Sequence, residues 1–119
     1  MDPLEGFDWE KERFPEQDVV SLPVKQYGRT IHLKSYRYPV PAGTTKKGVI
    51  FCVHGYGSWS EAAIASYKFF AEAGFEVFAS DMRGMGDSEG ERAIIESTDD
   101  VYNDAWLLIF ESIKKYEIN

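Results

Sequence analysis

The pattern of apolar and polar residues predicts two strands in the centre of a covered sheet. Val49–Val53 is a run of five apolar residues rich in β-branched types, and Phe75–Ser80 is a second, largely apolar run. Absence of polar alternation is typical of a strand buried on both faces, as in a parallel sheet with helices on each side. A strand, helix and strand of this length predict a crossover between parallel strands.

Two helices are predicted, one between these strands and one after them. Ser58 and Glu61 have the spacing of a capping box, apolar residues follow at helical spacing, and Gly74 is expected to close this helix. The second helix is expected to open at Ser97–Asp100, where acidic residues suit the helix dipole. Its buried stripe is expected to consist of Val101, Ala105, Leu108, Ile109, Ser112, Ile113 and Tyr116.

The chain before these elements predicts an arm followed by a hairpin. Residues 1–23 are acidic and are expected to be irregular, with the aromatic residues Phe7, Trp9 and Phe14 lying on the body of the protein. Lys25–Tyr27 and Thr30–Tyr38 are predicted to pair as a β-hairpin in which Gly28 supplies the turn. Residues 24–119 are interpreted as one α/β unit.

Composition narrows the class of protein. A length of 119 residues allows one domain with a modest core, and 44% hydrophobic residues favour a packed chain. The net charge of −7 argues against a nucleic-acid partner. The lone Cys52 can form no internal disulfide and suggests no metal, so we expect no cofactor and a reducing, cytoplasmic location. Neither a signal peptide nor a transmembrane segment is predicted.

Each predicted strand runs directly into a motif. The first continues into His54-Gly55-Tyr56-Gly57, and the second into Asp81-Met82-Arg83-Gly84-Met85-Gly86-Asp87-Ser88. This arrangement resembles the N-terminal half of an α/β-hydrolase, and more narrowly the monoacylglycerol lipase and lysophospholipase branch of the serine hydrolases. The resemblance implies a partial α/β-hydrolase fold, with an N-terminal hairpin and then parallel strands with crossover helices, truncated before the nucleophile strand.

The resemblance also implies roles for the motif residues. The family acts on esters of fatty acids with glycerol or on lysophospholipids by a Ser-His-Asp mechanism, and the backbone N–H of Tyr56 would donate to the oxyanion. His54 would shape that loop and not act as a base, whereas His32 is expected to be an exposed strand residue. The residues with structural roles would be His54, Gly55, Gly57, Asp81, Arg83, Gly84, Gly86 and Ser88.

The catalytic triad is expected to be missing from this chain. The chain is expected to contain no G-x-S-x-G turn, and Ser88 is interpreted as a turn residue. We therefore expect a fragment of a serine hydrolase that is inactive alone, whose full-length form would take a small lipid ester. A phosphate-binding loop is disfavoured because G-x-G-x-x-G would require glycine where Glu89 stands.

A non-enzymatic interaction module is the alternative. In this fold Phe75–Ser80 would lie between the hairpin side and Val49–Val53, which would leave an edge of Val49–Val53 unpaired. An exposed apolar edge readily pairs with another chain, so self-association through it is expected.

Overall fold

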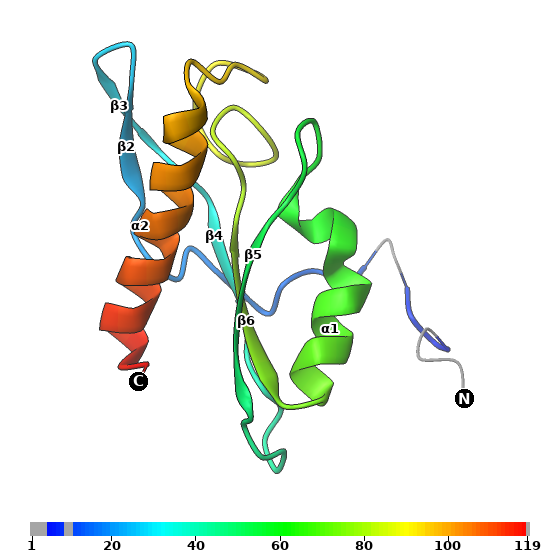
Figure 1. Cartoon of the computed structure of the whole chain (residues 1–119). Helices are drawn as coiled ribbons and strands as arrows, with labels where there is room; N and C mark the ends of the chain where they lie inside the picture. Colours follow the sequence, from blue (N-terminus) through cyan, green and yellow to red (C-terminus); the bar gives the residue numbers. More distant parts are fainter. Residues whose placement is uncertain (1–4, 9–10, 119) are drawn as a thin grey trace.

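The two apolar runs form the parallel pair at the centre of the fold, as predicted. Strand β5 (Gly48–Val53) pairs in parallel with β6 (Phe75–Ser80), and Ile50 lies opposite Val77. The computed structural model describes residues 5–8 and 11–118. It places a helix on each face of the sheet, so that the chain forms three layers (Figure 1).

The order of the strands leaves β5 with one free edge in the described part of the chain. The four-stranded sheet runs β1 (Glu16–Gln17), β4 (Ser35–Tyr38), β6 and β5, with β4 antiparallel to both β1 and β6. The predicted order is confirmed. The expectation that β5 is buried on both faces is wrong, because its residues have no neighbour on one side and stay partly exposed.

The hairpin forms, but it is shorter than predicted. Strands β2 (Pro23–Gln26) and β3 (Arg29–His32) pair antiparallel around a turn at Tyr27-Gly28, and His32 is exposed as expected. The second arm does not continue to Tyr38. The backbone N–H of Lys34 donates to Ser88 Oγ at 2.8 Å, which diverts the chain from the hairpin into the main sheet as β4.

The N-terminal arm packs its aromatic residues on the body. Phe14 is buried, stacks on Tyr36 with ring centroids 4.7 Å apart and lies 5.4 Å from Tyr67. Phe7 packs against the same cluster, whereas Trp9 lies outside the described residues. The arm is not irregular throughout, because it supplies β1. The boundary at residue 23 stays a prediction.

The first helix begins differently from the prediction. A 3₁₀ turn, η1 (Ser60–Ala63), precedes α1 (Ile64–Glu72), and no side chain caps either element. The capping box at Ser58 is therefore wrong. The Glu61 carboxylate instead accepts the N–H of Phe14 at 2.9 Å, because the arm lies across this end of the helix. Gly74 follows the last turn of α1, as predicted.

Helix α2 (Thr98–Tyr116) has the predicted cap, but only part of the predicted stripe is buried. Ser97 Oγ accepts the N–H of Asp99 at 3.1 Å. Leu108 and Ser112 are buried, as expected, but Asp104 is buried as well and Ile113 is exposed. No helix in the described ranges is long and apolar enough to cross a membrane.

Candidate active-site loops

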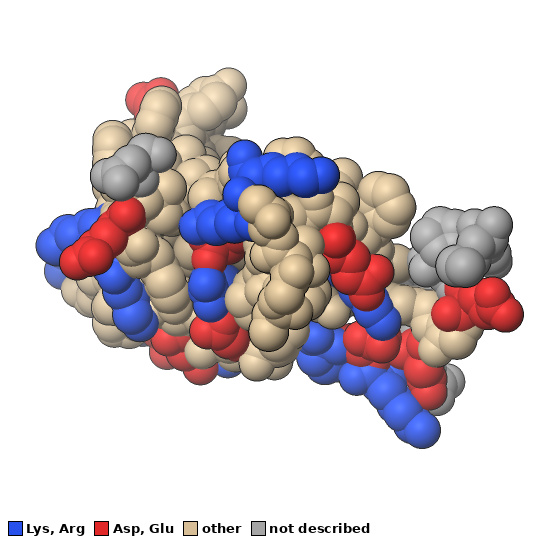
Figure 2. Space-filling view, turned by 90° about the horizontal axis from the view of Figure 1, so that it is seen from below, with Lys and Arg blue, Asp and Glu red and all other residues tan. Residues whose placement is uncertain are grey.

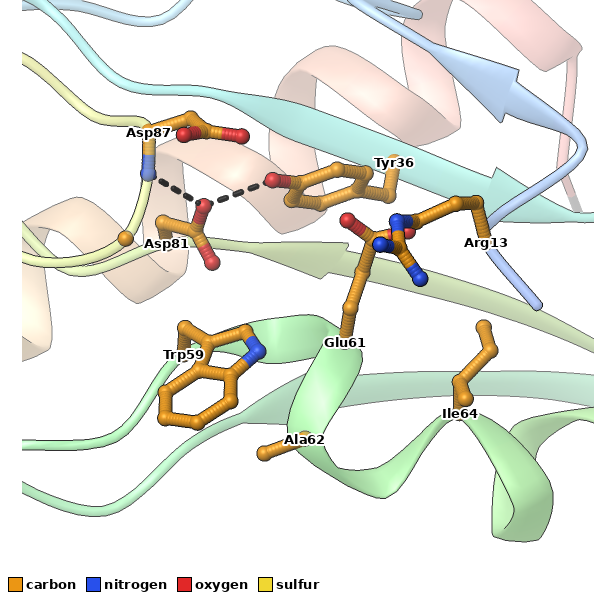
Figure 3. A pocket seen from close by; sticks show the side chains of 9 residues that line it. Arg13, Tyr36, Trp59, Glu61, Ala62, Ile64, Asp81 and Asp87 are labelled. Atoms are coloured by element: carbon orange, nitrogen blue, oxygen red, sulfur yellow. Dashed lines mark hydrogen bonds between the residues drawn. The ribbon is translucent and has the colours of Figure 1, made fainter. Parts of the chain in front are cut away.

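Asp81 organises the turn that follows β6. Its side chain is almost completely buried and accepts three hydrogen bonds, two of which are drawn in Figure 3. Oδ2 accepts from the Tyr36 hydroxyl at 2.6 Å and from the Asp87 N–H at 3.0 Å, and Oδ1 accepts from the Ser60 N–H at 2.7 Å. One carboxylate thus joins β4, η1 and the turn itself. Burial, and then the bond to Asp81, raise the pKa of Tyr36 above its ordinary value.

The glycines of this turn allow a close approach of the chain to itself. A side chain at Gly86 would place its Cβ 2.5 Å from Asp81 Oδ2, and one at Gly84 would meet the Glu91 carbonyl at 2.2 Å. Both residues also have positive φ angles, which favour glycine. Packing and backbone conformation therefore both require glycine at these two positions.

Arg83 fixes the turn to α2 through a buried ion pair. Its Nε and Nη2 donate to the two carboxylate oxygens of Asp104, each at 2.8 Å, and Nη1 donates to the Lys25 carbonyl at 2.8 Å. The bond to Asp104 raises the pKa of Arg83. Asp104 is a site residue that the sequence motifs do not indicate. The available signal was an acidic residue four positions before Leu108, on the face of the helix that the pattern buries.

His54 joins the two loops. Its Nε2 accepts the N–H of Met82 at 2.8 Å, and its Nδ1 lies 2.8 Å from the Gly55 carbonyl, to which it donates in that tautomer. Both ring nitrogens are therefore engaged with backbone. A general base needs a free nitrogen facing a nucleophile, so this arrangement fits a loop-shaping residue.

The loop after β5 contains a backbone N–H, that of Tyr56, which is available to a ligand. The Tyr56 side chain is 68% exposed, and its hydroxyl donates to the Ala93 carbonyl at 2.7 Å, which ties the loop to the segment beyond the turn. Within residues 5–8 and 11–118 the backbone N–H of Tyr56 has no hydrogen-bond partner. Gly55 and Gly57 have open space where a side chain would project. A ligand atom therefore has room to approach this N–H.

Ser88 lies in a sequence pattern that was not expected in this chain. The letters of Gly86-Asp87-Ser88-Glu89-Gly90 do match G-x-S-x-G, contrary to the expectation that the chain holds no such pattern. The side chain, however, is buried: its Oγ donates to the Asp81 carbonyl at 2.6 Å and accepts the N–H of Lys34 at 2.8 Å. In the described structure no histidine ring is hydrogen bonded to the Ser88 hydroxyl, so this side chain has the geometry of a turn residue.

A cavity of about 500 Å³ lies beside Asp81, on the α1 side (Figure 3). Its lining includes Arg13, Trp59 and Glu61 but no serine, cysteine or histidine, and so lacks both the nucleophile and the imidazole base of a serine hydrolase. Among the described side chains, no group of three or more His, Cys, Asp and Glu residues is placed to hold a metal ion.

Comparison with protein families identifies the fold and family. The model of the family described as serine aminopeptidase, S33, matches residues 44–118, more than half of the chain. The chain therefore belongs to this family of α/β-hydrolases. The match includes both motif loops and both helices. A comparison with curated proteins finds no match.

Solved structures show the same fold. A thermostable carboxyl esterase from Bacillus coagulans in complex with glycerol superposes with a TM-score of 0.61 at 20% identity, covering 82% of this chain and 33% of its own. A monoglyceride lipase variant from Saccharomyces cerevisiae, in complex with a substrate analogue, gives 0.61 at 20%, covering 89% and 36%. An open-form lipase gives 0.64 at 21%, covering 87% and 34%. The chain thus spans about a third of these proteins and has a partial α/β-hydrolase fold.

Proposed function

We propose that this chain supplies the oxyanion-hole loop of a serine hydrolase that acts on carboxylic esters of the monoacylglycerol or lysophospholipid type. The observation that carries the proposal is the free backbone N–H of Tyr56 in an exposed loop at the end of β5. Acyl transfer builds charge on a carbonyl oxygen, and a fixed, unpaired N–H stabilises that charge.

The position of this donor is well defined by its surroundings. His54 holds the start of the loop against Met82, and the Tyr56 hydroxyl holds its middle against Ala93. A donor that is fixed before substrate binds needs little reorganisation during the reaction, which is the source of its catalytic effect. The ester class is supported by the motif resemblance and by the carboxyl esterase and monoglyceride lipase among the similar structures.

The 119-residue chain by itself should not hydrolyse esters. Ser88 is the one serine in a G-x-S-x-G pattern, and it is buried and hydrogen bonded to backbone. We expect no labelling by a fluorophosphonate probe and no turnover of a short-chain p-nitrophenyl ester. Ser88→Ala is the matched control. Probe labelling that disappears in this variant would mean that Ser88 is a nucleophile after all.

The oxyanion role is testable in a longer protein that also carries the nucleophile turn and the triad histidine. Tyr56→Pro removes the N–H, whereas Tyr56→Ala keeps it and removes only the side chain. Loss of one such donor typically lowers kcat by about 10²–10³ with a smaller change in KM. A Tyr56→Pro enzyme that folds and retains its kcat would refute the assignment.

The second candidate function is a non-enzymatic interaction module. The observation in its favour is the free edge of β5, which can pair with a strand of another chain. Sequencing the coding region past Asn119 separates the two proposals, because a further G-x-S-x-G segment belongs only to the hydrolase. The cytoplasmic location and the absence of a nucleic-acid partner stay predictions. On the face drawn in Figure 2, basic and acidic residues are interspersed and do not form a basic patch.

A further inference from the structure

The loop after β5 reverses direction through a single β-turn. The N–H of Ser58 donates to the Gly55 carbonyl at 3.0 Å, which closes a turn with Tyr56 and Gly57 at its two central positions. Gly57 has a φ of +79°, whereas Tyr56 is not among the residues with positive φ. A positive φ at the second central position alone is the pattern of a type II turn. The donor proposed for the oxyanion, the N–H of Tyr56, therefore lies at the first central position of this turn.

The peptide plane before Tyr56 is fixed at its carbonyl end. The Gly55 carbonyl accepts the N–H of Ser58 and also lies 2.8 Å from Nδ1 of His54, which donates to it in the Nδ1–H tautomer. In a planar trans peptide the N–H points opposite to the C=O. The two bonds to this oxygen therefore aim the N–H of Tyr56 away from the inside of the turn, where it has no partner among the described residues.

The peptide plane after Tyr56 is fixed by one contact, which comes from the turn after β6. The N–H of Gly57 donates to Sδ of Met85, with the nitrogen and the sulfur 3.4 Å apart. Met85 is 4% exposed, and its own N–H and carbonyl are bonded within its turn, to Met82 and Ser88. At the other end of the plane, the Tyr56 carbonyl accepts no hydrogen bond within the described ranges. The thioether is therefore the sole hydrogen-bonding partner of this plane in the part of the chain that the structure describes.

This contact decides the orientation of the plane because the backbone alone does not. Type I and type II turns differ by a rotation of the central peptide, which exchanges the positions of its C=O and its N–H. Glycine adopts positive and negative φ with similar ease, so Gly57 accepts both orientations. An acceptor on one side of the plane favours the orientation in which the N–H points to it. A typical hydrogen bond shifts such an equilibrium by about two- to tenfold, and a thioether, as a weak acceptor, belongs at the lower end of this range.

We propose that Met85 is a positioning residue of the oxyanion loop, whose thioether holds the peptide between Tyr56 and Gly57 in the type II orientation. The inference rests on the proposed function of Tyr56. In the rotated orientation the Tyr56 carbonyl oxygen and the Gly57 N–H would exchange places beside the donor, so a bound oxyanion would meet a different field. Met85 thus acts through Tyr56 and needs no contact with substrate. Because it is buried between two loops of this chain, its role does not depend on a surface that a longer protein would cover.

Nuclear magnetic resonance on the 119-residue chain tests the orientation. A type II turn brings the Tyr56 Hα close to the Gly57 amide hydrogen, whereas a type I turn brings the two amide hydrogens together. In the unsubstituted chain we expect the first signal, a nuclear Overhauser contact between the Gly57 amide and the Met85 side chain, and slower hydrogen exchange at Gly57 than at Tyr56. Met85→Leu keeps the side-chain volume and removes the acceptor. It should shift the ratio of the two signals about threefold toward type I and accelerate exchange of the Gly57 amide.

Met82→Leu is the matched control, because Met82 belongs to the same turn but bonds the loop through its backbone N–H. It should leave the signals of Gly57 unchanged. Gly57→D-Ala in the Met85→Leu chain should restore the type II signals, since a D residue favours positive φ. Circular dichroism establishes that the variants fold. The proposal is overturned by an unsubstituted chain without the contact between Gly57 and Met85, by unchanged Gly57 signals in Met85→Leu, or by an equal change in Met82→Leu.

In a longer hydrolase the same variant separates this proposal from the proposed function. We expect Met85→Leu to lower kcat about two- to fivefold and to change KM less, because the donor that it positions acts on transition-state charge. An unchanged kcat in Met85→Leu beside a large loss in Tyr56→Pro overturns the role of Met85 and leaves the proposed function standing. An unchanged kcat in Tyr56→Pro refutes the proposed function, whereas the resonance signals of the 119-residue chain still decide whether Met85 holds the peptide.

Discussion

The turn after β6 and the loop after β5 follow parallel neighbouring strands and leave the sheet at the same end, yet their polar groups are satisfied in opposite ways. In the turn, the side chains of Asp81, Arg83 and Ser88 are buried and paired within the chain. In the loop, Tyr56 is exposed and its N–H has no partner within the described structure.

This difference indicates that the turn after β6 stabilises the fold, whereas the loop after β5 is available to bind a ligand. A buried polar group must be paired at folding because leaving it unpaired costs about 1–3 kcal/mol. A group that serves a ligand must be left unpaired, and this is affordable only where water can reach it. The polar groups of the turn are therefore already paired before any ligand binds, whereas the loop keeps a donor that a ligand can use. Mutations in the two regions should differ accordingly in their effect on stability.

The largest effect is expected at the buried ion pair. Asp104→Ala leaves the Arg83 guanidinium buried without its bidentate partner, and we expect a loss of about 3–5 kcal/mol in the free energy of unfolding. Urea denaturation followed by circular dichroism measures it. Arg83→Met with Asp104→Leu should recover most of the loss, since neither charge is then left unpaired. Lys34→Met, which breaks an ion pair to the exposed Asp18, should cost only about 0–1 kcal/mol.

Alanine substitutions at Gly86 in the turn and Gly57 in the loop allow a direct comparison of the two regions. Gly86→Ala would force Cβ into the Asp81 carboxylate and should cost about 2–4 kcal/mol. Gly57→Ala meets open space and carries only the strain of a positive φ, about 1 kcal/mol. Equal losses in the two variants, measured by thermal or urea unfolding, would contradict the view that the turn is closely packed and the loop is open.

Tyr36 gives the turn a dependence on pH. Burial and the bond to Asp81 raise its pKa above 10, so the folded chain retains a phenol proton that the unfolded chain releases. This stabilisation is fully present below pH 10 and is lost as pH rises above it. Tyr36→Phe should cost about 1–2 kcal/mol at neutral pH and reduce the alkaline loss. Some loss should remain, because burial raises the pKa of Tyr67 to about 12. An unchanged alkaline profile in Tyr36→Phe would exclude this cause.

The smallest effect is expected at the exposed loop. Tyr56→Phe removes the bond to the Ala93 carbonyl and should change the free energy of unfolding by at most about 0.5 kcal/mol, because water replaces the lost partner. Hydrogen exchange of the loop amides should accelerate more than global stability falls. A loss above 1.5 kcal/mol would show that the loop is part of the stable body.

The regular elements could be predicted from sequence because their signals are local. The apolar runs at Val49–Val53 and Phe75–Ser80 indicated their strands, and Ser97 indicated the start of α2. The start of α1 was misread because Glu61 is bound to the N–H of Phe14, 47 positions away, and local spacing does not report such a competitor.

The motifs of the site could be predicted from the sequence, but the hydrogen-bond network that joins them to other elements could not. Asp81 and Arg83 were recognised through their pattern, while the partners that bury them lie on other elements: Tyr36 on β4, Ser60 on η1 and Asp104 on α2. Ser88 illustrates the opposite problem. Its letters match a nucleophile turn, and only its burial and its two backbone contacts separate the two interpretations.

The convergence of three elements on Asp81 has a consequence for the order in which the chain folds. Its partners Tyr36 and Ser60 precede it by 45 and 21 positions. The turn is therefore not a local structure: a peptide of residues 81–88 lacks two of the three donors and has no reason to hold this shape. Because closing such separations is entropically costly, we expect the carboxylate to lock only after the sheet has assembled. During synthesis on the ribosome, Tyr36 and Ser60 emerge before Asp81. We therefore expect the hydrogen bonds of the Asp81 carboxylate to form last in the folding of this half of the sheet.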